Sequence, residues 1–104
     1  VEFNRYLTSY PDGSFAGDSY YHLGEVYWSQ GKYEQALQAL NLVVAKYRKN
    51  ENVPDATYQL AEVYRAMGEH DQARFMAQRV VRRYGDKSPQ AAERAQAFLA
   101  KYYP

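Results

Sequence analysis

Apolar residues recur along the chain with the three- and four-residue spacing of an amphipathic helix. The clearest stripes are Tyr20, Leu23 and Tyr27, then Ala36, Leu40, Val43 and Tyr47. Gly31 and Gly68 interrupt the pattern, and a glycine is favoured where a helix ends in a left-handed residue. The pattern predicts helices over 1–10, 16–30, 33–48, 53–67, 70–84 and 89–102.

The chain matches itself after a shift of 37 residues. Residues 16–47 and 53–84 are identical at 12 of 32 aligned positions. Leu7, Tyr10 and Pro11 fall one period before Val44, Tyr47 and Arg48, so the chain is expected to start inside an earlier repeat. We predict one domain over 1–104 with four parts. These are the second half of a preceding repeat over 1–11, repeats over 16–48 and 53–85, and a capping helix over 89–103.

Composition supports an all-α fold. The chain has no isoleucine and two threonines, but 14 alanines and 8 glutamines, so strand formers are scarce and helix formers common. Its 12 tyrosines suit helices that pack closely around flat aromatic wedges. The small residues Gly24 and Ala36, with Ala61 and Ala73 in the second copy, are expected where the two helices of a repeat cross.

One motif of the first copy resembles a known family. Tyr20-x2-Leu23-Gly24-x2-Tyr27, followed by Gly31, Tyr33, Ala36 and Leu40, resembles the tetratricopeptide repeat signature. The period of 37 is longer than the common 34, and the usual terminal proline is replaced by Arg48 and Gly85. The resemblance implies an α-solenoid of antiparallel helix pairs, with about two and a half repeats plus a C-terminal capping helix.

The residues favour no catalytic, metal or cofactor site, so we expect a protein that is not an enzyme. Cysteine is absent, which excludes thiol chemistry, and the only histidines are His22 and His70, without a metal-ligand spacing. Glu25 and Glu62 occupy equivalent positions and could act as an acid/base pair, but the sequence implies no deep pocket that would raise the pKa of either.

In the resembled architecture, the first helices of successive repeats line a concave groove. The repeat register carries nine candidate peptide-binding residues onto this side: Asp18, Tyr21, Glu25, Trp28, Asp55, Tyr58, Glu62, Arg65 and Tyr102. Trp28 aligns with Arg65, which favours a partly exposed position suited to peptide recognition. In the alternative interpretation, Trp28 and the two tyrosines Tyr21 and Tyr58 pack against neighbouring repeats. The set is aromatic and acidic with one arginine, which favours a basic or mixed apolar partner segment.

The formal net charge of +1 argues against a dedicated nucleic-acid binder, and no apolar run is long enough to span a membrane. Two alternatives to a peptide-binding scaffold stay open. One is a regulatory or nucleic-acid-associated module that uses the arginine-rich convex face of the second helices. The other is a purely structural piece of a longer solenoid.

The run Tyr10-Pro11-Asp12-Gly13-Ser14, followed by Asp18 to Tyr27, is similar to bacterial cell-envelope repeats. The closest resemblance is to the C-terminal domains of periplasmic Tol-Pal-associated coordinators of cell division (the CpoB/YbgF family). The next is to BamD-like lipoproteins of outer-membrane assembly. These resemblances imply a periplasmic adaptor, partners from the Tol-Pal or outer-membrane assembly machinery, and more chain upstream. A cytoplasmic location is the alternative.

Overall fold

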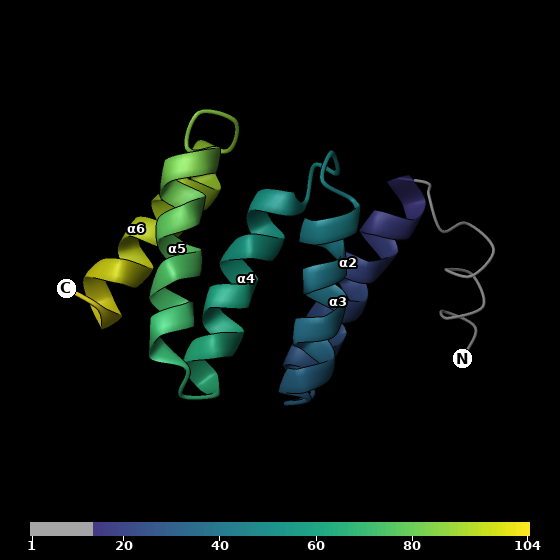
Figure 1. Cartoon of the computed structure of the whole chain (residues 1–104), viewed down its shortest axis with the longest axis horizontal. Helices are drawn as coiled ribbons and strands as arrows, with labels where there is room; N and C mark the ends of the chain where they lie inside the picture. The colour runs from purple at the N-terminus through teal and green to yellow at the C-terminus, as the bar shows by residue number, and fades with distance from the viewer. Residues whose placement is uncertain (1–13) are drawn as a thin grey trace. The chain divides into compact units, whose positions relative to one another are not determined.

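The computed structural model describes residues 14–104, and all regular secondary structure in this range is helical. The helices are α2 (Ser14–Ser29), α3 (Tyr33–Lys46), α4 (Val53–Ala66), α5 (His70–Tyr84) and α6 (Pro89–Tyr102) (Figure 1). The predicted all-α class is confirmed, and these five helices lie within two residues of their expected bounds. The expected helix over 1–10 and the half-repeat over 1–11 lie outside the described residues.

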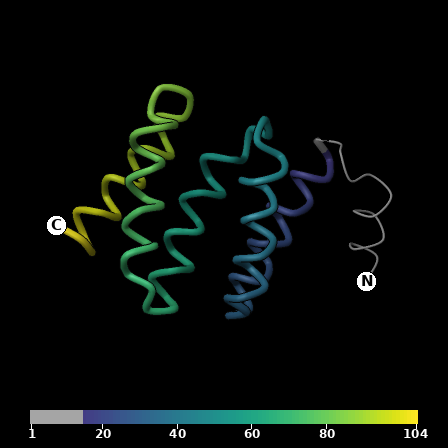
Figure 2. Tube along the Cα trace, viewed as in Figure 1, coloured from purple at the N-terminus to yellow at the C-terminus, as the bar shows by residue number. Residues whose placement is uncertain are grey.

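The chain divides into two compact units, with the boundary between Val53 and Pro54. The first unit holds α2 and α3, and the second holds α5, α6 and nearly all of α4. Within each unit, consecutive helices run in opposite directions and are joined by short connections (Figure 2). The boundary coincides with the start of the predicted repeat over 53–85, while the single domain over 1–104 stays a prediction.

The turn inside each helix pair is built in the same way in both units. Gly31 and Gly68 have φ angles of +75° and +83°, in the left-handed region that favours glycine. In the first turn, the Gly31 amide donates to the Trp28 carbonyl at 3.1 Å and the Lys32 amide donates to the Tyr27 carbonyl at 2.9 Å. This pair of bonds is a Schellman motif, which satisfies carbonyls that the end of α2 would otherwise leave open.

In the first unit, α2 and α3 approach closely at Gly24. A Cβ atom at this position would lie 2.7 Å from both Cγ and Cδ2 of Leu40, which is fully buried. Ala36, one turn earlier on α3, is also fully buried. The expectation that a small residue permits this crossing is confirmed for Gly24.

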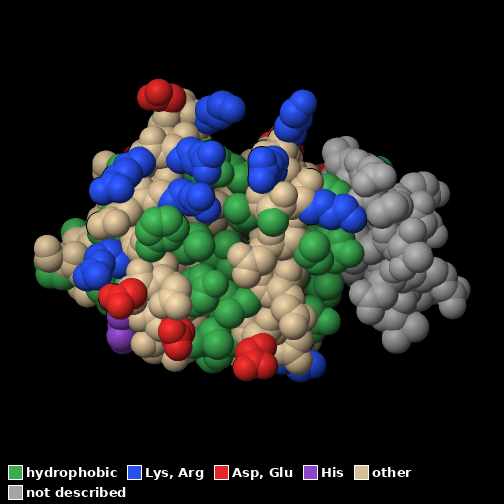
Figure 3. All heavy atoms as spheres, in the orientation of Figure 1, with side chains coloured by type: hydrophobic (Ala, Val, Ile, Leu, Met, Phe, Trp, Pro, Cys, Tyr) green, Lys and Arg blue, Asp and Glu red, His purple; other side chains and the backbone are tan. Residues whose placement is uncertain are grey.

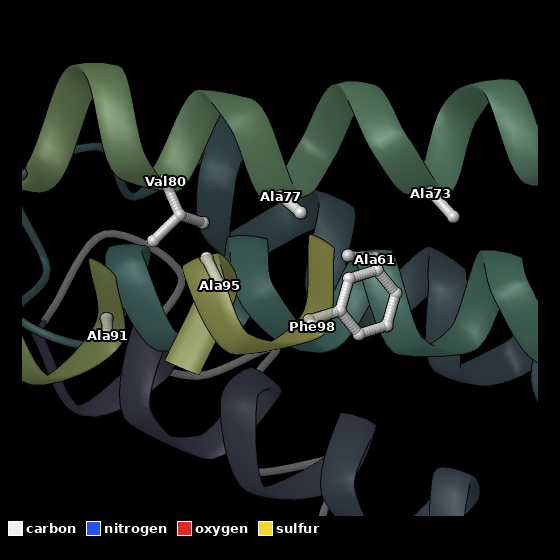
Figure 4. Close-up of a cluster of buried hydrophobic side chains, with 7 residues drawn as sticks. All are labelled: Ala61, Ala73, Ala77, Val80, Ala91, Ala95 and Phe98. Carbon is white, nitrogen blue, oxygen red and sulfur yellow. The ribbon is translucent and has the colours of Figure 1, made fainter. Parts of the chain in front are cut away.

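In the second unit, α4, α5 and α6 share one hydrophobic core. Its fully or almost fully buried members are Ala61, Ala73, Ala77, Val80, Ala91, Ala95 and Phe98. Figure 4 shows Ala73, Ala77 and Val80 projecting from α5 toward Ala61 and toward Ala95 and Phe98. Five of the seven are alanines, so these helices pack with little side chain between their axes, and Phe98 supplies the bulk.

Candidate protein-binding surface

The candidate residues of the first unit lie along one face of α2. Asp18, Tyr21, Glu25 and Trp28 follow the spacing i, i+3, i+7 and i+10, and all four are half-buried. The partial exposure of Trp28 agrees with the expectation from the sequence that this side chain is partly exposed. The four side chains nevertheless differ in how far they are engaged within their own unit.

Asp18 forms hydrogen bonds with the connection that follows α3. Its Oδ1 atom accepts hydrogen bonds from the side-chain amides of Asn50 and Asn52, both at 2.9 Å. The Asn52 backbone amide in turn donates to the Asn50 side-chain oxygen at 2.8 Å. The hydrogen bonds of Asp18 therefore hold this connection against α2. The repeat register did not indicate this structural role.

The aromatic residues of this face make ring contacts inside the first unit. The Trp28 ring centroid lies 5.5 Å from that of Tyr33 at the start of α3, with the planes tilted by 45°. The Tyr21 ring lies 5.6 Å from the His22 ring. His22 is exposed, and its Nδ1 atom lies 3.1 Å from a carboxylate oxygen of Glu25. Trp28 is thus held in place by Tyr33 while it keeps part of its surface open.

The candidate residues of the second unit lie on α4 and meet side chains of α6. Asp55, Tyr58, Glu62 and Arg65 are all half-buried. The contacts from α6 come from Arg94, Phe98 and Tyr102. We call these seven residues the α4–α6 surface.

Three contacts tie the α4–α6 surface together. An Arg94 Nη1 atom lies 3.8 Å from the Asp55 carboxylate. The Tyr58 ring meets the edge of the Phe98 ring at a centroid distance of 6.0 Å. The Arg65 guanidinium stands 4.0 Å from the centroid of the Tyr102 ring. This last distance is well within the range of a cation–π interaction, so the two side chains hold each other in a defined position.

Burial shifts the protonation of two groups on this surface. The pKa of Glu62 is raised by burial, although the nearby Arg65 and Arg94 act to lower it. The pKa of Tyr58 is also raised, mainly by burial and then by the negative charge of Glu62. The Tyr58 phenol therefore stays neutral at physiological pH and can both donate and accept hydrogen bonds.

Arg94 and Phe98 were missing from the sequence-based set. With Arg94 included, the α4–α6 surface has two arginines against two carboxylates, and is mixed in charge instead of acidic with one arginine. A signal was present in the sequence, because Arg94, Phe98 and Tyr102 follow each other at intervals of four on a predicted helix. Arg94 also borders an open hollow of about 480 Å³ on α6.

The histidines contribute to no metal site that the structure describes. His70 is exposed, and its Nδ1 atom lies 2.7 Å from the Tyr103 hydroxyl, an aromatic contact at the end of the second unit. Within residues 14–104, no group of three or more His, Cys, Asp or Glu side chains could hold a metal ion. In the same range, no helix combines the length and apolarity needed to cross a bilayer.

The second helices carry the basic residues that the alternative function would use. Arg74, Arg79, Arg82 and Arg83 all lie on α5. Arg74 pairs with Asp71 at 3.2 Å, and Arg79 stands 5.6 Å from the centroid of the Phe75 ring. These residues belong to a different helix from the α4–α6 surface.

Comparison with known proteins agrees with this architecture. The family model described as tetratricopeptide repeat matches residues 15–86, which span both predicted repeats. No curated protein and no solved structure matches the chain. Tetratricopeptide repeats generally mediate protein–protein interactions, and the fold typically serves as a non-enzymatic scaffold. The match covers well over half of the chain, and the chain therefore belongs to the tetratricopeptide repeat family.

Proposed function

We propose that this protein is a non-enzymatic scaffold that binds a segment of a partner protein through the first helices of its repeats. The observation that carries the proposal is the contact between Arg65 and Tyr102, 4.0 Å apart on the α4–α6 surface. Tyr102 is still 36% exposed. Arginine and tyrosine are among the residues that dominate binding energy at protein interfaces, particularly when they are held in place before binding.

The chemistry of the α4–α6 surface suggests the character of the partner. The surface combines two carboxylates and two arginines with the rings of Tyr58 and Tyr102, so a segment with mixed charges and apolar side chains would complement it. Trp28 of the first unit is proposed as a further aromatic anchor for a partner, because it is half-buried against Tyr33 and keeps part of its ring exposed.

We further propose that the partner is a component of the bacterial cell envelope and that the protein works in the periplasm. The support is the similarity of residues 10–27 to envelope repeats, including the Tyr10-Pro11-Asp12 run. The Tol-Pal and outer-membrane assembly machineries are the sources of partner that this similarity suggests. The absence of cysteine is compatible with a periplasmic location and does not favour it over a cytoplasmic one.

The experiment is a crosslinking pull-down from a bacterial envelope extract, in parallel with a cytoplasmic extract. We expect Trp28→Ala and Arg65→Gln to keep the circular dichroism spectrum of the wild type. Each should weaken partner binding by about 2 kcal/mol, roughly thirtyfold. Leu42→Ala on α3 and Arg48→Gln after α3 are the matched controls, since both residues are exposed and lie outside the candidate surfaces.

The variants separate a binding role from a packing role. If Trp28→Ala unfolds the protein while binding per folded molecule is unchanged, Trp28 is a core residue and not an anchor. If the controls reduce capture as much as Trp28→Ala and Arg65→Gln do, the proposed surface is wrong. Capture from the cytoplasmic extract alone would contradict the envelope partner and leave the scaffold function standing.

A further inference from the structure

The outer side of α5 carries a cationic and apolar surface that the proposed function does not use. It is formed by Phe75, Arg79, Arg82 and Arg83, which we call the α5 patch. Positions 75, 79, 82 and 83 follow the spacing i, i+4, i+7 and i+8, so they share one face of the helix. Figure 3 looks onto this side, where Lys and Arg side chains gather over α5 beside exposed hydrophobic surface.

The four side chains of the α5 patch line a shallow pocket of about 210 Å³. Small-molecule sites usually have volumes of about 300–1,000 Å³, so this pocket is small for a cofactor or metabolite. A cavity of about 150 Å³ can accept a benzene ring, so there is room for one aliphatic or aromatic side chain. Phe75 supplies an apolar wall and is 55% exposed.

The charges of the α5 patch are not balanced within the described part of the chain. Asp71, in the first turn of α5, is paired with Arg74 at 3.2 Å, and Arg79, Arg82 and Arg83 form no ion pair there. Arg82 and Arg83 lie in the last turn, where the helix dipole favours cations. The dipole does not account for Arg79 or for the exposed ring of Phe75, both of which lie further from the helix end.

We infer that the α5 patch docks an acidic protein segment in which one apolar side chain is flanked by carboxylates. The apolar side chain enters the pocket beside Phe75, and the carboxylates accept paired hydrogen bonds from the guanidinium groups. The sites of the proposed function lie on α2, α4 and α6, so this inference stands or falls independently of it.

Two other anionic partners fit the α5 patch less well. Nucleic acids that bind without base pairing need several aromatic platforms, and the patch has one ring, already faced by Arg79 at 5.6 Å. A net charge of +1 also gives little long-range attraction for a polyanion. A membrane surface would require α5 to insert an apolar face, but Ala73, Ala77 and Val80 on that face are buried in the core.

The test is a titration of the ¹⁵N-labelled protein, followed by amide chemical shifts. One probe is a short Glu/Ser peptide with a single central leucine, and its matched partner has serine in place of leucine. We expect shift changes centred on α5, affinity that falls with added salt, and about tenfold tighter binding of the leucine peptide. Oligothymidylate and vesicles of phosphatidylcholine with phosphatidylglycerol are titrated in parallel.

The decisive variant is Arg79→Gln/Arg82→Gln/Arg83→Gln, and its control Lys32→Gln/Arg48→Gln/Lys49→Gln removes the same charge from the first unit. The α5 variant should weaken peptide binding at least about tenfold and the control less than about twofold. Phe75→Ala should abolish the preference for leucine. Three outcomes would overturn the inference. They are chemical-shift changes confined to other helices, equal losses of peptide affinity in both triple variants, or tighter binding of the oligonucleotide or vesicles than of the peptide. Thermal melts confirm that each variant is folded.

Discussion

Individual side chains on the α4–α6 surface contact one another within the second unit, and they are also the side chains proposed to meet a partner. The Arg65 guanidinium lies on Tyr102, Arg94 reaches Asp55, and Glu62 lies half-buried near both arginines. Because burial raises the pKa of Glu62 in spite of these cations, the loss of water outweighs the attraction to the arginines. A charged Glu62 therefore opposes folding slightly.

This gives a prediction for the pH dependence of Glu62→Gln. Below the ordinary carboxyl pKa of 4.5, residue 62 is protonated in both the folded and the unfolded wild type. As the pH rises above that value, the unfolded state loses its proton first and is stabilised, so the wild type loses stability. We expect Glu62→Gln to gain stability relative to the wild type between pH 4 and pH 7, measured by urea unfolding at each pH. Glu25→Gln, at the equivalent position of α2, is the matched control.

The pH dependence of the stability difference between Glu62→Gln and the wild type tests this prediction. A difference in the free energy of unfolding that stays constant with pH would contradict a raised pKa. A variant that becomes progressively less stable than the wild type as the pH rises would mean that the arginines outweigh burial.

At the scale of helices, close packing depends on residues with little or no side chain. Gly24 lets α2 approach Leu40 of α3. In the core of α4, α5 and α6, alanines likewise leave little side chain between the helices. The left-handed glycines Gly31 and Gly68 end the first helix of each pair with the same Schellman motif. The helix ends therefore depend on local backbone chemistry, and the distance between helices depends on the size of a few residues.

Gly24→Leu should destabilise the first unit by about 1–3 kcal/mol, because its Cβ alone would come within 2.7 Å of the Leu40 side chain. The measurement is urea or thermal unfolding. Val26→Leu on the same helix is the control, since Val26 is exposed and a surface change of this kind should alter stability by less than about 0.5 kcal/mol. Adding Leu40→Ala should relieve part of the strain, so the double variant should be less unstable than the two single losses summed. Strict additivity would argue against the contact.

For the molecule as a whole, we predict that the two compact units fold as one. The sequence predicts a single domain over 1–104, and stacked repeats gain much of their stability from their neighbours because one repeat cannot bury its apolar face alone. The core of the second unit contains Phe98, which is 4% exposed and contacts Tyr58, Tyr102 and Tyr103. A cavity at Phe98 therefore offers a way to perturb one unit and observe the other.

Phe98→Ala should cost about 3–5 kcal/mol, the usual range for truncating a buried phenylalanine. Amide hydrogen exchange should show lower protection in α4, α5 and α6 and, if the units fold as one domain, an equal fall in α2 and α3. Leu99→Ala, a half-buried neighbour on α6, is the control and should have a smaller effect. Protection in α2 and α3 that stays at the wild-type level would show that the units unfold separately and would contradict the single-domain prediction.

The helices, the turns inside each helix pair and the family could all be predicted from the sequence. Helix periodicity and glycine at a helix end are local properties, so the stripe around Leu23 and the turn at Gly31 could be read from neighbouring residues. The 37-residue repeat then placed equivalent residues of the two copies on the same face of their helices.

Which side chains meet one another depends on how the helices pack in three dimensions. Three contacts join residues that lie more than thirty positions apart in the sequence. They are the ion pair of Arg94 with Asp55, the ring contact of Tyr58 with Phe98 and the hydrogen bond of Asn50 with Asp18. Such contacts depend on the rotation and offset of one helix against another, and a period within a single helix contains no information about either. The repeat register could therefore place Asp55 and Tyr58 on the candidate surface, but it could not reveal the partners that α6 brings to them.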